Sequence, residues 1–357
     1  MSTSPDVPDG GEIVFLVPAI HDLQTGGNVY NRRIVEQLRP KKPVQVVAWS
    51  PDEAPASDLA LSGADVLIVD SLLAQHPEAL RTVKEAAPAA MMVLVVHYLR
   101  CVDPSVTNGD TGANERVTLT VVDGAIATSR FVKRSLEEEG VPPEREAVVQ
   151  PGLDERYRGA LPLRMGMGPP RILTVANLLP EKGLQLFVEV LRDLRDLPWT
   201  WTLVGDASLD PEYAAGVFRR IRAAGLTDRV MWTGPIAPEA LRTGYDRADL
   251  FAVPSRFETC SLSTREAMAR GLPVVGYRVG GIAENFGGAA AGHLVPPGNG
   301  AALRAALRSL LTDPLSQRRK GIAAWRRSHE FPKWEEAADR FLDALASLHA
   351  RPPKGTQ

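Results

Sequence analysis

The feature that most constrains the fold is a regular alternation of short apolar runs with amphipathic, helix-like segments. The runs are apolar at consecutive positions, which is typical of strands buried on both faces of a parallel sheet. Two sheets of about six strands are more natural than one sheet of about twelve. The sequence therefore predicts an α/β protein with two Rossmann-like, doubly wound parallel-sheet domains. The expected strands are residues 13–18, 44–49, 65–70, 91–97, 124–128 and 147–150, then 171–176, 199–205, 229–233, 250–254, 273–277 and 293–295.

A stretch rich in glycine and proline at 159–170 suggests a domain boundary. No clear period crosses it, so we expect an N-terminal domain at 1–160, a linker at 161–170 and a C-terminal domain at 171–330. A long surface loop within one domain is the alternative. The remaining segment, 331–357, is expected to form a closing helix that packs back toward the N-terminal domain. Its apolar residues at helical spacing are Trp334, Ala337, Phe341, Leu345 and Leu348.

Charge and composition exclude several classes of protein. The 357 residues include 41 Lys and Arg against 43 Asp and Glu, a net charge of −2, which argues against a nucleic-acid partner. The two cysteines, Cys101 and Cys260, exclude a disulfide framework and a cysteine-rich metal site. No apolar run approaches the ~20 residues of a membrane span, and the first residues lack a signal-peptide pattern. A cytoplasmic location is therefore expected.

One basic stretch has two interpretations. Peripheral contact with anionic lipid or with an anionic acceptor is the first. A solvated helix face is the second, and the near-neutral charge balance favours it. The stretch comprises Arg32, Arg33, Arg39, Lys41 and Lys42.

The strand-to-helix turns are where ligands are expected, because doubly wound sheets bind them beyond the carboxyl ends of strands. After the first strand, Gly26 and Gly27 would let the backbone approach a ligand, and Asn28 could cap a helix that begins near Val29. A plain tight loop is the alternative. His97 ends the fourth strand at a ligand-binding position, although a structural histidine is the more frequent case.

Two turns of the second half carry charged residues. Lys182 opens a helix beside a glycine, where an ammonium group can reach a phosphate. Glu258 lies in the loop after a later strand. Glu266 lies on the helix that opens near Leu262, and the first N–H groups of that helix can bind an anion. Taken singly, such charges are more often solvated groups near a helix start.

Residues 254–275 resemble the Glu-x7-Glu signature of retaining glycosyltransferase family 4, which has the GT-B fold. Residues 175–183 resemble the donor-diphosphate loop of that family, and 127–129 and 151–154 resemble two landmarks of its N-terminal half. The resemblance covers nearly the whole chain and is stronger in the C-terminal half. The matching sequence motifs are Pro-Ser-x-x-Glu, Glu-Ala-Met-Ala-x-Gly-x-Pro-Val-Val, Gly280-Gly281 with Glu284, and Gly292-His293-Leu294-Val295-Pro296-Pro297-Gly298.

The resemblance implies that the two domains face a central cleft, with the acceptor on the N-terminal side and a nucleotide sugar on the C-terminal side. His97 and Glu258 would be the catalytic residues that contact the donor sugar. Glu266 would hold the ribose hydroxyls and Ile236 would lie near the base. Lys182 would bind the diphosphate. The implied donor-binding set is completed by Gly26, Gly27, Asn177, Ser261, Leu262 and Ser263.

The chain departs from the pattern of the family at two positions. Asn177 stands where the family usually has Arg, so one cation on the leaving group is absent and activity could be lower. Arg256 is a candidate replacement for that cation. Ser261 stands where the family has a glycine, which narrows the space beside the phosphate.

The predicted activity is retaining transfer of a sugar, a hexose by preference, from a nucleotide-diphosphate sugar to a small-molecule, lipid or glycan acceptor. No metal and no cofactor are expected, so protein groups would stabilise the departing diphosphate. The alternatives are a degenerate nucleotide-sugar binding protein and a pseudo-glycosyltransferase on the same fold. A dehydrogenase is disfavoured because no Gly-x-Gly-x-x-Gly follows the first strand.

Overall fold

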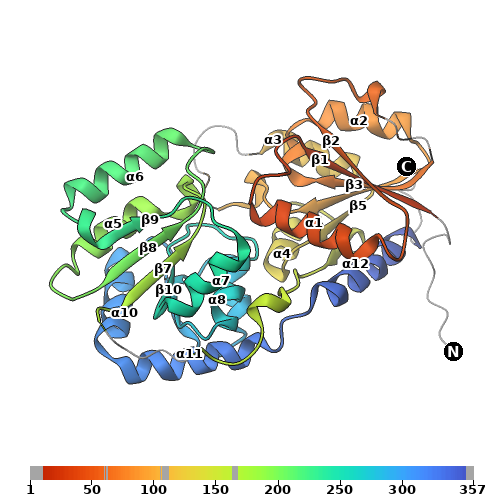
Figure 1. Ribbon diagram of the computed structural model, residues 1–357. Coiled ribbons are helices and arrows are strands. Elements are labelled where there is room, and N and C mark those ends of the chain that lie inside the picture. Colours follow the sequence, from red (N-terminus) through yellow and green to blue (C-terminus); the bar gives the residue numbers. More distant parts are fainter. Residues whose placement is uncertain are drawn as a thin grey trace. The chain divides into compact units, whose positions relative to one another are not determined.

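The computed structural model describes residues 11–59, 61, 63–104, 106, 112–162 and 168–350. These residues form two six-stranded sheets in which all recorded strand pairs are parallel, with helices packed against them (Figure 1). The predicted α/β class with two doubly wound sheets is confirmed. Five residues of the predicted linker, 163–167, lie outside the described residues.

The first sheet has the strand order β2-β1-β3-β4-β5-β6. The chain moves from β1 to β2 on one side and then to β3 on the other, so the topological switch point lies between β1 and β3. Every residue of β4 is buried, which is typical of a strand covered by helices on both faces. The strands are β1 Glu12–Pro18, β2 Val44–Trp49, β3 Ala64–Asp70, β4 Met91–Val96, β5 Gly124–Ala127 and β6 Glu146–Val148. The α-helices are α1 Gly26–Leu38, α2 Pro77–Ala86, α3 Ala113–Val121 and α4 Arg130–Glu138.

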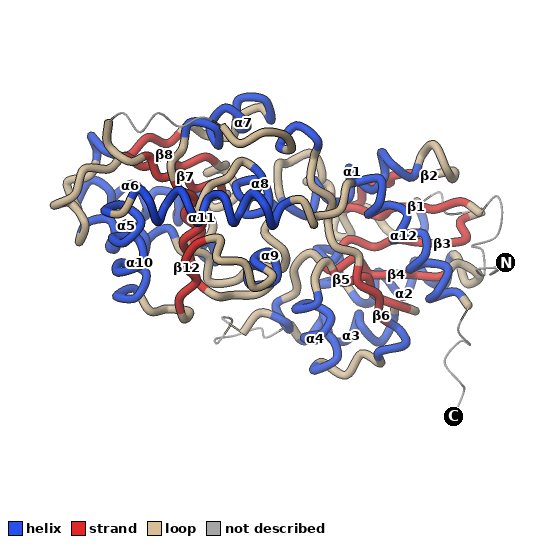
Figure 2. Tube along the Cα trace, turned by 90° about the horizontal axis from the view of Figure 1, so that it is seen from below, coloured by secondary structure: helices blue, strands red, loops and turns tan. Residues whose placement is uncertain are grey.

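The second sheet has the order β12-β11-β10-β7-β8-β9, which places its switch point between β7 and β10. Helix α11 packs beside α8 (Figure 2). The strands are β7 Arg171–Val175, β8 Thr200–Val204, β9 Val230–Trp232, β10 Leu250–Val253, β11 Val274–Tyr277 and β12 Gly292–Val295. The α-helices are α5 Leu184–Arg192, α6 Pro211–Ala223, α7 Pro238–Arg247, α8 Leu262–Ala269, α9 Ile282–Phe286, α10 Gly300–Thr312 and α11 Pro314–Ser328.

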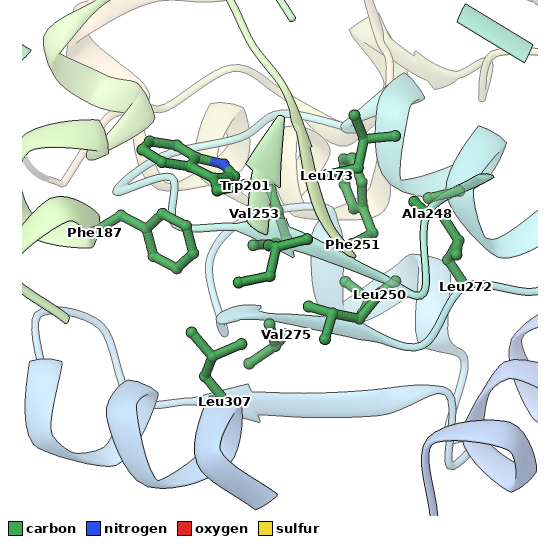
Figure 3. Close-up of a cluster of buried hydrophobic side chains, with 14 of the residues drawn as sticks. Leu173, Phe187, Trp201, Ala248, Leu250, Phe251, Val253, Leu272, Val275 and Leu307 are labelled. Carbon is green, nitrogen blue, oxygen red and sulfur yellow. The ribbon is translucent and has the colours of Figure 1, made fainter. Parts of the chain in front are cut away.

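The core of the second sheet combines aliphatic side chains with aromatic rings, among them Phe187, Trp201 and Phe251 (Figure 3). Phe187 from α5 packs edge-on against Trp201 of β8, with ring centroids 5.2 Å apart. The buried indole Nε1 of Trp201 donates to Oγ1 of Thr174 at 3.0 Å. A large aromatic is tolerated in this core because its polar atom has a partner.

The chain divides into two compact units, Met1–Gly152 with Lys333–Gln357 and Leu153–Pro332. The first unit is completed by α12, Trp334–His349, which packs against α1. Phe341 of α12 stacks on Phe15 of β1 with centroids 6.0 Å apart. Gly152 permits this return of the chain, because a Cβ there would lie 2.5 Å from the backbone nitrogen of Trp334.

The unit boundary differs from the predicted domain boundary at residue 160. Residues 153–160 belong to the second unit. The backbone N–H of Leu153 donates to the carbonyl of Pro332 at 2.8 Å, and Tyr157 lies in the core of this unit. The glycine–proline stretch indicated an irregular segment before β7. The units separate earlier, after residue 152, because the hydrogen bond of Leu153 and the burial of Tyr157 tie residues 153–160 to the second unit.

Candidate functional site

The candidate site of the second unit begins at the switch point, where the loops after β7 and β10 are tied together. A short 3₁₀ turn, Pro180–Lys182, ends at Gly183, which has a φ of 66°. A Cβ on Gly183 would lie 2.1 Å from the carbonyl oxygen of Pro254, so this close approach requires glycine. The N–H of Arg256 donates to the carbonyl of Glu181 at 2.7 Å. Lys182 is thereby held against the loop that carries Glu258.

Lys182 and Glu258 form an ion pair in this position. The Nζ of Lys182 lies 3.0 Å from Oε1 of Glu258, and Oγ of Ser255 donates to the same oxygen at 2.8 Å. The side chains are 22% and 13% exposed, respectively. The site therefore offers a cation that can bind phosphate and a carboxylate that can accept from hydroxyl groups.

The position of Glu258 is also fixed through its backbone. Its carbonyl accepts from the N–H of Gly281 at 2.9 Å. Gly280 has a φ of 47°, and a Cβ there would lie 1.7 Å from the same carbonyl oxygen. The Gly-Gly pair after β11 thus lets two loops approach at a distance that a side chain would prevent.

Helix α8 begins from a backbone conformation that is unusual for its residue type. Ser261 has a φ of 61°, and it is the single non-glycine residue with positive φ in the described ranges. Its side chain does not cap the helix and instead lies 2.8 Å from Oγ1 of Thr264. The amide of Asn285 holds the turn by donating to the carbonyl of Cys260 at 2.7 Å. A left-handed serine costs about 1 kcal/mol, which explains why a glycine suits this position.

Glu266 is held by a tyrosine that the sequence analysis did not single out. The hydroxyl of Tyr245, from α7, donates to Oε2 of Glu266 at 2.8 Å and lies 3.3 Å from the carbonyl oxygen of Ser263. Tyr245 is fully buried, and Tyr157 packs edge-on against it with centroids 5.6 Å apart. Burial, with the charge of Glu266, raises the pKa of Tyr245 well above its usual value. Tyr245 is therefore a neutral donor to Glu266.

Asn177 and Ile236 lie in other loops of the same unit. The Oδ1 of Asn177 accepts from the N–H of Asp206 at 3.1 Å, which joins the ends of β7 and β8. Gly205 allows this junction, since a Cβ there would lie 1.9 Å from the carbonyl oxygen of Ala176. Ile236 is partly buried and packs against the core. Leu262 and Ser263, in the first turn of α8, are also partly buried.

His97 and Gly27 lie in the first unit and contact each other. A Cβ on Gly27 would lie 2.9 Å from Cγ of His97, so the first turn of α1 lies against the imidazole ring. The Nε2 of His97 lies 2.8 Å from Oδ1 of Asn31 and 3.8 Å from Oδ2 of Asp70. Burial lowers the pKa of His97, and the nearby charge of Asp70 opposes that effect.

The start of α1 differs from the prediction. The helix begins at Gly26, and the capping side chain is Thr25, whose Oγ1 accepts from the N–H of Asn28 at 3.1 Å. Asn28 instead donates to the carbonyls of Ile20 and Leu23, at 2.9 and 3.0 Å. A Cβ on Gly26 would meet no heavy atom within 4 Å.

Two residues of the basic stretch form ion pairs. Arg33 pairs with Glu36, and Lys41 pairs with Asp339 of α12. Among the described residues, no group of three or more His, Cys, Asp or Glu could hold a metal ion. None of the helices in the described ranges combines the length and the apolar character that crossing a membrane requires.

Residues 162–327 match the profile of the family described as "Glycosyl transferases group 1". This segment is therefore similar to the group 1 glycosyl transferases. The matched residues include Asn177, Lys182, Ile236, Tyr245, Glu258 and helix α8. The family assignment made from the Glu-x7-Glu segment is therefore confirmed at the level of group 1.

Curated relatives and solved structures agree with this similarity and with the fold. The chain is 30% identical to a D-inositol 3-phosphate glycosyltransferase of Rhodococcus erythropolis, over 74% of this chain and 64% of the relative. It superposes on sucrose-phosphate synthase of Thermosynechococcus elongatus with a TM-score of 0.78 at 20% identity, over 95% and 99% of the two chains. Anabaena HepE in complex with UDP-glucose gives the same TM-score and identity, over 94% and 99%. The GT-B fold is thus confirmed.

The chain spans less than two thirds of the length of the curated relatives that it matches first. The structure brings Lys182 and Glu258 into direct contact and places Glu266 on the adjacent helix α8. His97, Gly26 and Gly27 belong to the other unit. Sequence reasoning missed Tyr245 and Asn31, because neither lies in a recognisable motif and each is identified by a tertiary contact.

Proposed function

We propose that the protein is a glycosyltransferase that moves a sugar from a nucleotide-diphosphate sugar to a hydroxyl-bearing acceptor. The observation that carries the proposal is the Lys182–Glu258 pair at the switch point of the second sheet, next to the N-terminus of α8. Ligands of doubly wound sheets bind at such a point, and a helix N-terminus favours a phosphate. The match of residues 162–327 to group 1 glycosyl transferases supports the same conclusion.

The diphosphate would be bound by Lys182 together with the backbone N–H groups of Leu262 and Ser263. These N–H groups belong to the first turn of α8, where backbone donors lack helical partners. Arg256 is proposed as a second cation in place of the arginine that Asn177 replaces. Its backbone is already tied to Glu181, next to Lys182.

The ribose and the base would lie beyond the diphosphate. Glu266 would accept hydrogen bonds from the ribose hydroxyls, with Tyr245 holding its carboxylate in place. Ile236 would contact the base. A uridine base is the first to test, because a protein of the same fold, HepE, forms a complex with UDP-glucose.

The donor sugar would be contacted by Glu258 and by His97. In the transfer step, the bond between the anomeric carbon and the diphosphate oxygen breaks, and its electron pair leaves with the diphosphate. The acceptor oxygen forms the new bond to that carbon on the same face, and its proton passes to the leaving phosphate. Lys182 and the α8 N–H groups would stabilise the charge that develops on the leaving group, each worth about 10²–10³ in rate.

Nucleotide-sugar turnover tests this proposal directly. UDP-, GDP-, ADP- and dTDP-sugars would be compared by thermal shift and by nucleotide release, with wild type, Glu266→Ala and Lys182→Ala. A ligand at about 100 times its Kd stabilises the folded protein by about 2.7 kcal/mol. One nucleotide class should stabilise the wild type and fail to stabilise Glu266→Ala. The absence of any nucleotide-dependent shift or release would refute the proposed function.

Stereochemistry, metal dependence and location are separate parts of the proposal. The anomeric configuration of the product, read by NMR, should be that of the donor. Activity should persist with excess EDTA, because protein groups are proposed to stabilise the diphosphate. A hexose donor, a small-molecule, lipid or glycan acceptor and a cytoplasmic location stay predictions, as does peripheral membrane contact.

A further inference from the structure

The imidazole ring of His97 is held by a chain of hydrogen bonds that starts at a buried carboxylate. The side chain of Asp70, at the end of β3, is 1% exposed. Its Oδ1 accepts from the N–H of Leu72 at 2.8 Å, and its Oδ2 accepts from Nδ2 of Asn31 at 2.6 Å. The Oδ1 of Asn31 then lies 2.8 Å from Nε2 of His97.

The chemistry of these groups determines which one donates and which one accepts in each hydrogen bond. The amide nitrogen of Asn31 donates to Asp70, so the amide oxygen of Asn31 faces His97. An amide oxygen only accepts, so Nε2 of His97 must carry a proton. In a neutral imidazole the other nitrogen, Nδ1, then carries the lone pair and is a hydrogen-bond acceptor.

The surroundings of the ring favour its neutral form. The His97 side chain is 9% exposed, and burial lowers its pKa, although the charge of Asp70 acts in the opposite direction. Tyr30 packs edge-on against the ring with centroids 5.1 Å apart, and its hydroxyl donates to the carbonyl of Val149 at 3.0 Å. Trp334 of α12 in turn packs against Tyr30 at 5.8 Å. The ring thus contacts Tyr30 and Asn31 of α1. Trp334 of α12 supports Tyr30, and Asp70 of β3 supports Asn31.

We propose that Asp70 and Asn31 are positioning residues that fix the tautomer of His97, with the proton on Nε2, so that Nδ1 accepts a hydrogen bond from a hydroxyl of the donor sugar. The identity of this ligand rests on the proposed function. The tautomer, by contrast, is a property of the free protein. A nitrogen held as an acceptor selects ligands that present a hydroxyl and discriminates against a deoxy or O-alkylated sugar at that position.

The first test is ¹⁵N NMR of the free protein with ring-labelled histidine, and His97→Gln assigns the signals. At neutral pH, His97 should show a protonated, pyrrole-type Nε2 and an unprotonated, pyridine-type Nδ1. A proton on Nδ1, or a doubly protonated ring, would overturn the proposal. This measurement needs no nucleotide, so its failure is distinguishable from failure of the proposed function.

The second test replaces Asp70, the first residue of this series of hydrogen bonds. In Asp70→Asn, the new amide can donate or accept, so Asn31 can turn its nitrogen toward His97 and Nδ1 can take the proton. We expect a mixture of the two tautomers in this variant, and an unchanged ¹⁵N signature would overturn the proposal. The matched control is Glu146→Gln, another buried carboxylate of the same unit, which should leave the His97 signals as in the wild type.

Turnover gives the functional arm of the test. Asp70→Asn should lower kcat/KM about tenfold with the preferred donor, the size expected for loss of one hydrogen bond. With a donor that lacks the recognised hydroxyl, wild type and Asp70→Asn should turn over equally. If Asp70→Asn lowered kcat/KM by the same factor with every deoxy donor, the variant would have a general structural defect, and the positioning role would be overturned.

Discussion

The hydrogen bond from Tyr245 to Glu266 can be removed with little change in shape. Tyr245→Phe deletes one hydroxyl from a fully buried ring and keeps the ring packed against Tyr157. The bond to Oε2 of Glu266 is 2.8 Å long and joins a neutral donor to a carboxylate. Hydrogen bonds to charged groups contribute about 1.5–3 kcal/mol to stability. Because Glu266 is partly exposed, water can replace part of this bond, and we expect the lower value, about 1.5 kcal/mol.

Two assays measure the effect of losing this hydrogen bond. Urea unfolding should show the free energy of unfolding of Tyr245→Phe lowered by about 1–2 kcal/mol. Calorimetric titration with the preferred nucleotide should show a Kd raised about tenfold, since 1.4 kcal/mol corresponds to a factor of ten. The carboxylate of Glu266 would then have to be ordered by the ribose itself.

The control and the refuting result follow from the same contacts. Tyr157→Phe keeps the aromatic pair and leaves the Tyr245–Glu266 bond intact, so its Kd should match the wild type. In a Glu266→Ala background, Tyr245→Phe should raise the Kd no further, because the two residues act through one interaction. A wild-type Kd for Tyr245→Phe, or additive effects in the double variant, would refute the argument that Tyr245 positions Glu266.

Three further predictions each concern a single residue. Burial raises the pKa of Glu146 to about 7, so the folded state keeps a proton that the unfolded state loses above about pH 4.5. The free energy of unfolding should therefore fall between about pH 4.5 and 7, by up to about 1.4 kcal/mol per pH unit, and urea titrations of Glu146→Gln should lack this slope. Gly280→Ala should lower the melting temperature and abolish nucleotide binding, since its Cβ would lie 1.7 Å from the carbonyl oxygen of Glu258. Arg256→Ala should reduce kcat by about 10²-fold if this residue replaces the missing cation, whereas an unchanged rate would assign leaving-group stabilisation to Lys182 and α8.

Much of the fold was predictable because it depends on local pattern. Apolar runs such as 91–97 identify buried strands, and the structure places Met91–Val96 in the centre of a six-stranded sheet. The site loops were predictable because their glycines are required by close backbone approaches. Gly183 and Gly280 would each bring a Cβ within about 2 Å of a carbonyl oxygen of another loop.

Local details that depend on competing partners were less predictable. Both Thr25 and Asn28 are good capping residues, and the choice depended on which carbonyls the loop 20–23 presents to the Asn28 amide. Similarly, the unit boundary at 152–153 depends on where residues 332–334 return, a contact between segments far apart in the chain.

The sequence by itself determined the two sheets, the family resemblance and the chemical types available at the site, because hydrophobic period, glycine and charged residues at strand ends are local properties. The tertiary structure alone decided how those groups are oriented and protonated. Asp70, Asn31 and His97 are far apart in sequence, yet one hydrogen-bond chain joins them. Tyr245 likewise reaches Glu266 across 21 residues. Hydrogen bonds are short and directional, so their partners are fixed only when the packed sheets bring distant side chains within about 3 Å.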